Sequence, residues 1–423
     1  MKNRNPHAGR PAQAESSATY IDAEKTFGAR NYDPLPVVVS HGEGAWLWDI
    51  HGRRFLDMMS AYSAVSHGHA HPRIVTALVA QAQQLAVTSR AFHNDKLPLF
   101  LKRLTEVTGL ARALPANGGA EAVETALKAV RKWGYKVKRI PDGQAEVIVC
   151  AGNFHGRSIT IVGFSSEAQY RDGFGPFAPG FKAIPFGDPA ALEAAITPHT
   201  AAFLVEPVQG EAGMIVPPAG YLAECARICR KHRVLMICDE IQTGMGRTGR
   251  LWGVDHWDVQ PDILCVGKSI GGGVMPLSAF ISTPEIWEVL IPNPIIHSTT
   301  FGGNPIACAA GIAAIQVTLE EDLPGQAATK GDYLLTELRG LMQRFPQILS
   351  DVHGKGLLIG MEFHSDPIGW KCASGLFQRG VLVAGTYSKA RTIRIEPALG
   401  IPMDLLKEML GRLEDTFKEI GKA

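Results

Sequence analysis

Four short apolar segments, separated by helix-like stretches, constrain the fold of this chain more than any other feature. They read EVIVCAG (146–152), AAFLVEP (201–207), VLMICDE (234–240) and DILCVGK (262–268). Each is almost continuously apolar, which is typical of a parallel strand covered on both faces. Stretches such as PAALEAAI and YLAECARICRKHR, which lie between them, have helical periodicity. We therefore expect an α/β domain that binds its ligands beyond the carboxyl ends of the strands.

The two ends of the chain follow a different pattern. Residues 44–59 alternate between apolar and polar and turn at His51-Gly52, which predicts a hairpin. After about residue 318, helical stretches alternate with GKGLLIGMEF, GVLVAG and TIRIEP, an α+β pattern. The expected parts are a disordered tail (1–18), an N-terminal segment packed beside the small domain (19–59), a large α/β domain (60–315) and a small α+β domain (316–423).

Composition excludes several classes of partner. Lys plus Arg (42) nearly balances Asp plus Glu (41), and no block of like charge occurs, so neither nucleic acid nor an anionic membrane is an expected partner. No apolar run is long enough to span a bilayer. The first residues lack the apolar core of a signal peptide, which predicts a cytoplasmic protein. The seven scattered cysteines contain no C-x-x-C motif and are expected to be buried, reduced thiols.

Lys268 ends the last of the four apolar segments. Gly267-Lys268-Ser269 looks like the end of a P-loop, but that motif needs a glycine where this chain has Asp262, and its other glycines follow the lysine. An amine at the end of a buried strand instead has its pKa lowered by lost hydration, and it can form a Schiff base with an aldehyde. The cofactor suited to this chemistry is pyridoxal 5'-phosphate.

Residues for the other parts of such a cofactor site are also present. Asp239 ends the preceding apolar segment and could hold the ring nitrogen protonated. A glycine pair at 118–119 precedes an amphipathic helix beginning near Ala120, whose free N–H groups could bind the phosphate. Phe154 follows the first apolar segment and could stack on the ring. Each residue alone also has an ordinary structural explanation, such as a helix cap or a turn.

Five motifs in chain order resemble those of the class III (ω-) aminotransferases, pyridoxal-phosphate enzymes of fold type I. They are GNFHGR, VEPVQGEAG, DEIQTGMGRTG, PDILCVGKSIGGGVMP and STTFGGNP, and the resemblance extends from about Asn31 to the C-terminus. Within the family, NYDPLPV, SAYSAVSHGHAHP and AEAVETALKAVRKWGY are most similar to the ornithine-specific branch. VQPDILC, FGGNPIACAA and RGVLVAGTYSKARTIRIEP are more similar to the putrescine-specific branch. The resemblance implies a mostly parallel sheet in a large domain, a smaller α+β domain and a homodimer.

By position, the resemblance implies roles at the cofactor ring. Lys268 would form the Schiff base and move a proton between the substrate carbon and the cofactor. Asp239 would pair with the ring nitrogen, and Gln242 would hydrogen-bond the ring hydroxyl. Phe154 would stack on the ring, with His155 beside it.

The resemblance also implies a phosphate site shared between subunits. Gly118, Gly119 and Ala120 would hold the phosphate, and Thr300 would reach it from the neighbouring subunit. Gly118 departs from the family, which commonly has Ser or Thr here, so one side-chain hydroxyl is missing. Glu206, in the VEP motif, is expected beside the cofactor.

The substrate residues follow from the same resemblance. Arg394 would bind a substrate carboxylate in the bidentate geometry that suits 2-oxoglutarate, and Glu211 would mask it while an ω-amine donor is bound. Tyr32 and Arg157 would hold the distal α-amino and carboxylate groups of ornithine, and Tyr62 would line the pocket. Putrescine has no carboxylate, so these residues favour an amino-acid donor.

The sequence thus predicts a ping-pong aminotransferase that moves the δ-amino group of ornithine to 2-oxoglutarate, forming glutamate semialdehyde and glutamate. Putrescine, cadaverine or lysine as donor stays an alternative. So do a racemase or decarboxylase on the same fold and a non-catalytic phosphate-binding protein. The histidines of HGHAHP (67–72) are interpreted as structural rather than metal-binding, and no metal is expected.

Overall fold

The computed structural model describes residues 16–290, 297–386 and 391–422. Its largest sheet has seven strands, and all are parallel except β10, which is antiparallel to both of its neighbours. The order across the sheet is β4 (Arg112–Ala116), β10 (Ser278–Ser282), β9 (Ile263–Val266), β8 (Leu235–Asp239), β7 (Thr200–Val205), β5 (Glu146–Cys150) and β6 (Phe181–Ile184).

The four predicted strands are confirmed as β5, β7, β8 and β9, which are mutually parallel. Their apolar character has a simple cause, because alternate residues are buried on opposite faces of the sheet. In β5, Val147 and Val149 belong to one core, and Ile148 belongs to the other. The antiparallel strand β10 was missed. It returns beside β9 after residues 267–277, which contain one 3-10 turn, rather than after a crossover helix.

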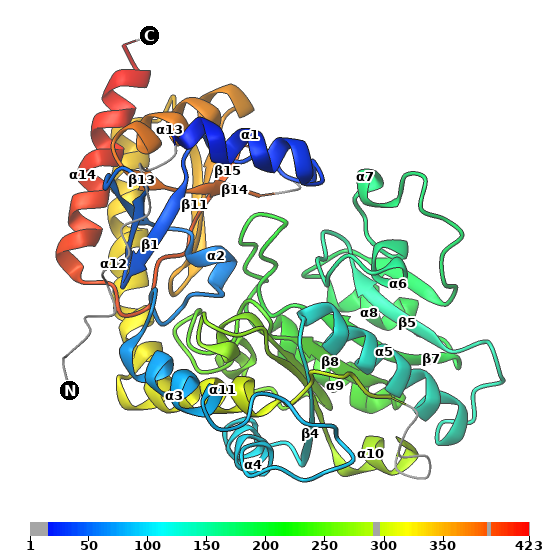
Figure 1. Ribbon diagram of the computed structural model, residues 1–423. Helices are drawn as coiled ribbons and strands as arrows, with labels where there is room; N and C mark the ends of the chain where they lie inside the picture. The colour runs from blue at the N-terminus through cyan, green and yellow to red at the C-terminus, as the bar shows by residue number, and fades with distance from the viewer. Residues whose placement is uncertain (1–15, 291–296, 387–390, 423) are drawn as a thin grey trace, which may run out of the picture.

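Helices cover both faces of this sheet (Figure 1). On one face, α5 (Gly119–Lys136) packs against β7, β9 and β10, and α10 (Pro284–Leu290) packs beside it. On the other face, α9 (Tyr221–His232) packs against β8. Besides α2, which is described with the site, the other helices between residues 60 and 320 are α3 (Pro72–Ala82), α4 (Leu97–Thr108), α6 (Ile159–Gly163), α7 (Ala168–Arg171), α8 (Pro189–Ala195), α11 (Pro305–Glu320) and the 3-10 turns η1 (Gly253–Trp257) and η2 (Lys268–Gly271).

Two smaller sheets lie to one side of the large one (Figure 1). The first contains β1 (Val39–Glu43), β2 (Trp46–Asp49), β3 (Arg54–Asp57) and β13 (Val381–Leu382). The predicted hairpin is confirmed as β2 and β3, and β13 pairs in parallel with β3, so C-terminal chain completes an N-terminal sheet. The second contains β11 (Leu349–Lys355), β12 (Leu358–Phe363), β15 (Thr392–Ile395) and β14 (Ala384–Gly385).

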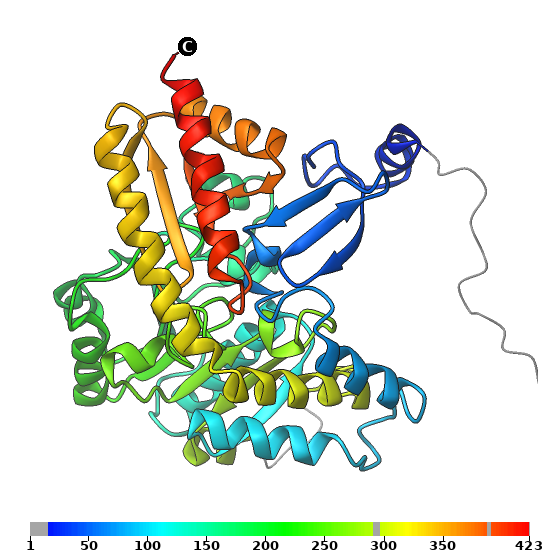
Figure 2. The same ribbon diagram turned by 90° about the vertical axis from the view of Figure 1, so that its left-hand side faces the viewer.

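Three long helices accompany the second small sheet. They are α12 (Leu323–Arg344), α13 (Asp366–Gln378) and α14 (Met403–Ile420). Figure 2 shows α12 in yellow and α14 in red lying side by side. Phe417 of α14 packs edge-on against Phe345 and Phe363, which places an aromatic cluster between the helices and the sheet.

The N-terminal tail differs in part from expectation. Residues 1–15 lie outside the described chain, but α1 (Ser17–Phe27) begins inside the range predicted to be a disordered tail. Ser16 caps this helix, because its side chain accepts a hydrogen bond from the Thr19 amide. Over the described residues, no helix combines the length and apolarity needed to cross a membrane.

The seven cysteines are all free and buried, as the sequence predicted. Burial raises the pKa of Cys225 and Cys308 to about 12 and also raises that of Cys229, so these thiols stay protonated. They act as small apolar side chains in the core.

The three histidines of HGHAHP point to different partners. His67 Nε2 lies 2.9 Å from Thr318 Oγ1 and 3.1 Å from the Ala314 carbonyl on α11. His69 Nε2 lies 2.7 Å from Asp57 Oδ2, and His71 Nε2 lies 3.3 Å from Glu321 Oε1. The described residues contain no group of His, Cys, Asp and Glu arranged to hold a metal.

We predict that His67 makes the fold sensitive to acid. Burial lowers the pKa of His67 from 6.5 to about 4. The unfolded chain therefore takes up this proton first as the pH falls from 6.5 to 4, and roughly 3 kcal/mol of stability is lost over that window. Chemical denaturation at pH 7 and pH 4.5 should show a smaller loss in His67→Gln than in the unchanged protein. Equal losses in the two proteins would contradict the assignment.

Candidate active site

The carboxyl ends of β5, β7, β8 and β9 meet at one edge of the large sheet, and a pocket of about 190 Å³ opens there. Residues that follow each strand line it together with the start of α5 and the turn after β8. The predicted site residues among its lining are Gly119, Ala120, Phe154, His155, Glu206, Asp239, Gln242 and Lys268. Parallel strands bring these residues together because all of their carboxyl ends lie at the same edge.

Lys268 enters the pocket just beyond β9. Its backbone has φ 48°, and Gly272, at φ 69°, lets the chain turn away behind it. Burial lowers the pKa of the Lys268 amine, although the charges of Glu211 and Glu396 oppose this effect. A lowered pKa increases the neutral, nucleophilic fraction of the amine near neutral pH.

Asp239 and His155 form a buried pair across the pocket. His155 Nδ1 lies 2.7 Å from Asp239 Oδ2, and Asp239 Oδ1 accepts a hydrogen bond from the Ile241 amide at 3.0 Å. Burial alone would lower the pKa of His155, but the hydrogen bond and charge of Asp239 raise it overall. Within the described chain, the buried His155 Nε2 has no hydrogen-bond partner, so this ring can bind a further group.

Glu206 lies behind this pair. Its carboxylate accepts a hydrogen bond from the Phe154 amide at 3.2 Å. Burial raises the pKa of Glu206 to about 8, so it is largely protonated at neutral pH and adds little negative charge beside Asp239.

The pocket fits the phosphate of the expected cofactor at the start of α5. The first N–H groups of a helix have no partner inside the helix, and Gly119 and Ala120 both line the pocket. Close packing around them needs small residues. A Cβ at Gly156 would approach Ala120 Cβ to 2.8 Å, and one at Gly119 would approach Ile241 Cδ1 to 2.9 Å. An amine, a carboxylate and a helix N-terminus in one pocket are the groups that pyridoxal phosphate requires.

Two predicted phosphate residues are not part of this lining. The Gly118 carbonyl accepts a hydrogen bond from Ser278 Oγ at 2.8 Å, and a Cβ at Gly118 would meet no atom within 4 Å. Thr300 is exposed. Its neighbour Thr299 lines a separate cavity of about 190 Å³ with Arg90 and His297.

Arg394 and Glu211 form a buried, bidentate ion pair. Arg394 Nη1 lies 3.0 Å from Glu211 Oε1, and Nη2 lies 2.7 Å from Oε2. Both side chains are almost completely buried. Burial lowers the pKa of Arg394, but the charges of Glu211 and Glu396 outweigh it and raise the pKa overall. Arg394 and Glu211, which the sequence predicted to interact, are therefore in direct contact.

Tyr62 reaches this ion pair from an unusual turn. Ser60, Ala61, Tyr62 and Ser63 (α2) have φ values of 45°, 47°, 59° and 71°, a single left-handed turn without glycine. Such a turn costs about 1–2 kcal/mol per residue. It places the Tyr62 ring 5.0 Å from the Arg394 guanidinium carbon.

Arg157 lies against aromatic rings. Its guanidinium carbon is 5.8 Å from the Phe154 ring and 5.0 Å from the Tyr170 ring. Arg157 therefore connects α7, which carries Tyr170, to the loop that carries Phe154. Phe154 itself faces the pocket. Tyr32, in contrast, is 58% exposed and does not line the pocket in this single chain.

Several residues of the site were missed in the sequence. Glu396 is fully buried and lies 3.4 Å from Arg394 Nη1, and Ser63 Oγ donates to it at 2.8 Å. Glu396 could have been found, because it stands two residues after Arg394 and side chains at that spacing share one face of a strand. Tyr170 had no comparable signal, since only the fold brings α7 beside Arg157.

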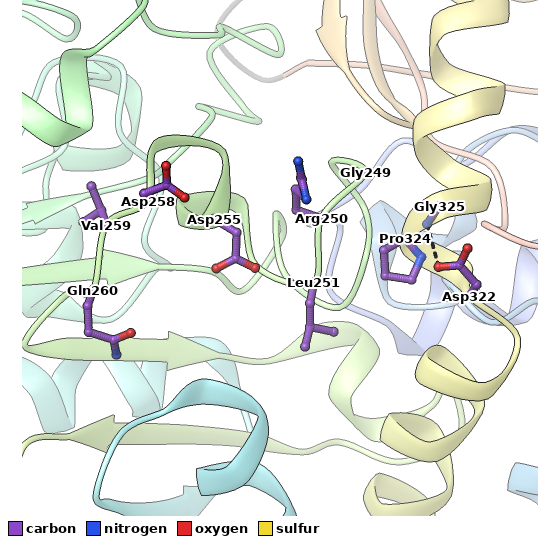
Figure 3. Close-up of a pocket in the computed structure, with 10 residues that line it drawn as sticks. All are labelled: Gly249, Arg250, Leu251, Asp255, Asp258, Val259, Gln260, Asp322, Pro324 and Gly325. Atoms are coloured by element: carbon purple, nitrogen blue, oxygen red, sulfur yellow. Dashed lines mark hydrogen bonds between the residues drawn. The ribbon is translucent and has the colours of Figure 1, made fainter.

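A second, larger cavity of about 770 Å³ lies away from these residues (Figure 3). It opens between the turn around η1 and the start of α12, where Asp322 Oδ1 accepts a hydrogen bond from the Gly325 amide at 3.2 Å. None of the predicted site residues lines it. Its volume alone does not make it a binding site.

A mostly parallel sheet with a buried lysine and aspartate at its carboxyl edge is the arrangement of the fold type I pyridoxal-phosphate enzymes. The chain belongs to the class-III aminotransferases, whose family model matches residues 27–417.

The relatives of the chain agree with this class. It is 47% identical over 400 residues to an ornithine aminotransferase from Brevibacillus brevis, covering 95% of this chain and 97% of the relative. It is 50% identical over 346 residues to one from Bacillus subtilis, covering 82% and 85%.

Solved structures agree as well. The crystal structure of the ornithine aminotransferase from Toxoplasma gondii matches with a TM-score of 0.93 and 40% identity over 97% of each chain. An acetylornithine aminotransferase from Elizabethkingia anophelis matches with a TM-score of 0.86 and 41% identity, covering 96% of this chain and all of that one.

We predict that Gly118→Ser tightens cofactor binding. Gly118 has φ −103° and ψ 155°, which serine adopts easily, and its missing side chain points into open space. A hydroxyl there could bind the phosphate, which would lower the dissociation constant about tenfold, the value of one charge-assisted hydrogen bond. Absorbance titration of the apoprotein with pyridoxal phosphate measures this change. Gly118→Ala is the matched control. If both variants bind the cofactor equally more tightly, the serine hydroxyl is not the cause.

The left-handed turn gives a second prediction. Ala61 is exposed, with φ 47° and ψ 50°. Glycine adopts this conformation without strain, so Ala61→Gly should stabilise the fold by about 1 kcal/mol. Ala80→Gly, at an exposed position of the right-handed α3, should instead destabilise it by a similar amount. Denaturant unfolding of both variants is the measurement, and destabilisation by both would contradict the predicted strain.

Proposed function

We propose that this protein is an aminotransferase that binds pyridoxal 5'-phosphate and transfers the δ-amino group of ornithine to 2-oxoglutarate. The observation that carries the proposal is the buried Arg394–Glu211 pair beside the lysine pocket. An arginine that can be masked or exposed allows one pocket to serve a cationic donor and a dicarboxylate acceptor in turn. The names of the bacterial relatives support the same donor.

The donor proposal depends on Arg157 and Tyr32. Arg157 lies beside the pocket residue Phe154, where its guanidinium could bind the α-carboxylate of ornithine. Tyr32 would add a hydrogen bond to the α-amino group. Glu211 meanwhile keeps Arg394 from attracting that carboxylate, so the δ-amino end is directed toward Lys268.

When bound, pyridoxal phosphate supplies the aldehyde that takes the amino group and a ring that accepts electrons from the substrate carbon. Asp239 would keep the ring nitrogen protonated, and His155 orients the Asp239 carboxylate. The Lys268 amine, with its lowered pKa, would carry the proton to and from the substrate carbon. Phe154 would stack on the ring, and Gly118, Gly119 and Ala120 would hold the phosphate.

We also propose that the protein is a cytoplasmic homodimer in which Thr300 completes the phosphate site of the partner. Large apolar side chains are exposed in the single chain: Phe301 beside Thr300 (56%), Phe92 (68%) and Leu99 (55%). Arg90 Nη1 donates to the Gly302 carbonyl at 3.5 Å, so the chain segments that carry Phe92 and Phe301 lie together. An exposed apolar patch of this kind is typical of a subunit interface.

We also propose the division into domains. Residues 60–315 would form the cofactor-binding domain and residues 316–423 the small domain.

A donor panel tests the proposal. Ornithine, N-acetylornithine, lysine and putrescine are compared at fixed 2-oxoglutarate, and glutamate formation is measured. We expect kcat/KM to be highest for ornithine. A clear preference for N-acetylornithine would move the assignment to the activity named for the Elizabethkingia relative, and a preference for putrescine would show that Arg157 does not select the donor. Lys268→Ala should be inactive and lack the absorbance near 420 nm of a lysine-bound cofactor.

Arg157→Ala provides the sharper prediction. Loss of a charged hydrogen bond should lower kcat/KM for ornithine about 30-fold to 100-fold, while putrescine, which has no carboxylate, is unaffected. Arg171→Ala is the matched control, because Arg171 also lies on an aromatic ring, 5.4 Å from Phe177. An equal loss for both donors would show that Arg157 acts on the fold of its loop and not on the substrate.

A further inference from the structure

The carboxylate of Glu396 is held in place by donors from three separate parts of the chain. Ser63 Oγ donates at 2.8 Å, Gln242 Nε2 lies 3.2 Å from both carboxylate oxygens, and Arg394 Nη1 lies 3.4 Å from Oε1. The Glu396 amide also donates to the Met58 carbonyl at 2.7 Å. The side chain is completely buried. It could not move without leaving several buried donors unsatisfied, which is costly.

Glu211 is held much less firmly. Its hydrogen bonds within the described chain go to Arg394 alone, and it lies in the loop between β7 and α9. When Glu211 leaves, only Arg394 loses a partner, and Glu396 still contacts it. The two carboxylates therefore differ in mobility, although both face the same guanidinium.

We propose that Glu396 is the fixed counter-ion of Arg394 and sets the affinity for the acceptor carboxylate that Arg394 binds. This inference rests on the proposed function, in which Glu211 leaves Arg394 so that a dicarboxylate can bind. While the exchange takes place, Glu396 prevents Arg394 from becoming an unpaired buried charge. Because Glu396 repels an incoming carboxylate, it also weakens that binding, which lets the dicarboxylate product dissociate.

Other charges near Glu396 do not replace it in this role. Arg247 is fully buried nearby, but its guanidinium donates to the Leu357 and Pro397 carbonyls and to Ser66 Oγ, not to either glutamate. The charges of Glu211, Glu396 and Arg394 also affect the pKa of the Lys268 amine, but at longer range. The contact with Arg394 is therefore the one through which Glu396 acts on substrate.

The test measures binding of glutarate, an unreactive dicarboxylate, to the holoenzyme by isothermal titration calorimetry. Glu396→Gln keeps the size of the side chain but removes the charge, and it should bind glutarate about tenfold more tightly. In steady-state assays the variant should lower both KM for 2-oxoglutarate and kcat, because product release slows.

Three further variants separate charge from structure. Glu396→Asp keeps the charge and should retain the affinity of the unchanged protein. Glu362→Gln removes a carboxylate paired with Arg391 on the same sheet and should also have no effect. Ser63→Ala keeps Glu396 but removes one of its hydrogen-bond donors. The Glu396 carboxylate should then interact more strongly with Arg394, so glutarate should bind about twofold more weakly. This last variant remains informative if Glu396→Gln does not fold.

The outcomes for Glu211→Gln distinguish this inference from the proposed function. If Glu211→Gln binds glutarate more tightly and Glu396→Gln does not, the proposal that Glu396 sets the affinity is wrong, and the proposal that Arg394 binds the acceptor is supported. If neither variant binds glutarate more tightly, Arg394 is not the acceptor site, and the proposed function and this inference both fail. Tightening in both variants, with Glu396→Asp unchanged, supports the inference.

Discussion

The parallel alignment of β5, β7, β8 and β9 is the constraint on which the rest of this structure depends. Because the strands run in the same direction, their carboxyl ends place four segments, distant in sequence, around one pocket. His155, Glu206, Asp239 and Lys268 each stand within a few residues of a strand end. Their chemistry is a consequence of this shared edge. Burial there lowers the pKa of Lys268 and raises that of Glu206, while at His155 the hydrogen bond and charge of Asp239 outweigh burial and raise the pKa.

A second constraint is electrostatic. A fully buried arginine is stable only when it is paired, and Arg394 has two carboxylates for that purpose. One belongs to a loop of the large-sheet region, and the other directly follows β15, the strand that carries Arg394. This division would allow one partner to be exchanged while the other stays, as the proposed exchange of a cationic donor for a dicarboxylate acceptor needs.

The site also depends on local strain. The left-handed turn of Ser60–Ser63 is unfavourable in isolation, yet it directs Tyr62 onto Arg394 and Ser63 onto Glu396. The hydrogen bond from the Glu396 amide to the Met58 carbonyl, just before this turn, helps to keep it in place. The turn that directly follows the N-terminal segment is therefore part of the site.

Much of the fold could be predicted from the sequence because its signals are local. Continuous apolar runs identified the four parallel strands, and alternation identified the hairpin of β2 and β3. The direction of β10 could not be predicted, since a buried five-residue apolar strand has the same pattern in either orientation. The start of α1 was missed because its cap depends on a single serine in an otherwise polar stretch.

For the site, the sequence by itself determined which residues we propose for the chemistry, because Lys268, Asp239 and the pair of Arg394 with Glu211 all stand in recognisable motifs. Only the tertiary structure decided how they are held. Ser63, Tyr170 and Gln242 reach their partners across more than a hundred residues of chain or from a helix packed beside a loop. Such contacts arise from packing between elements, and neither periodicity nor spacing along the chain records which elements will meet.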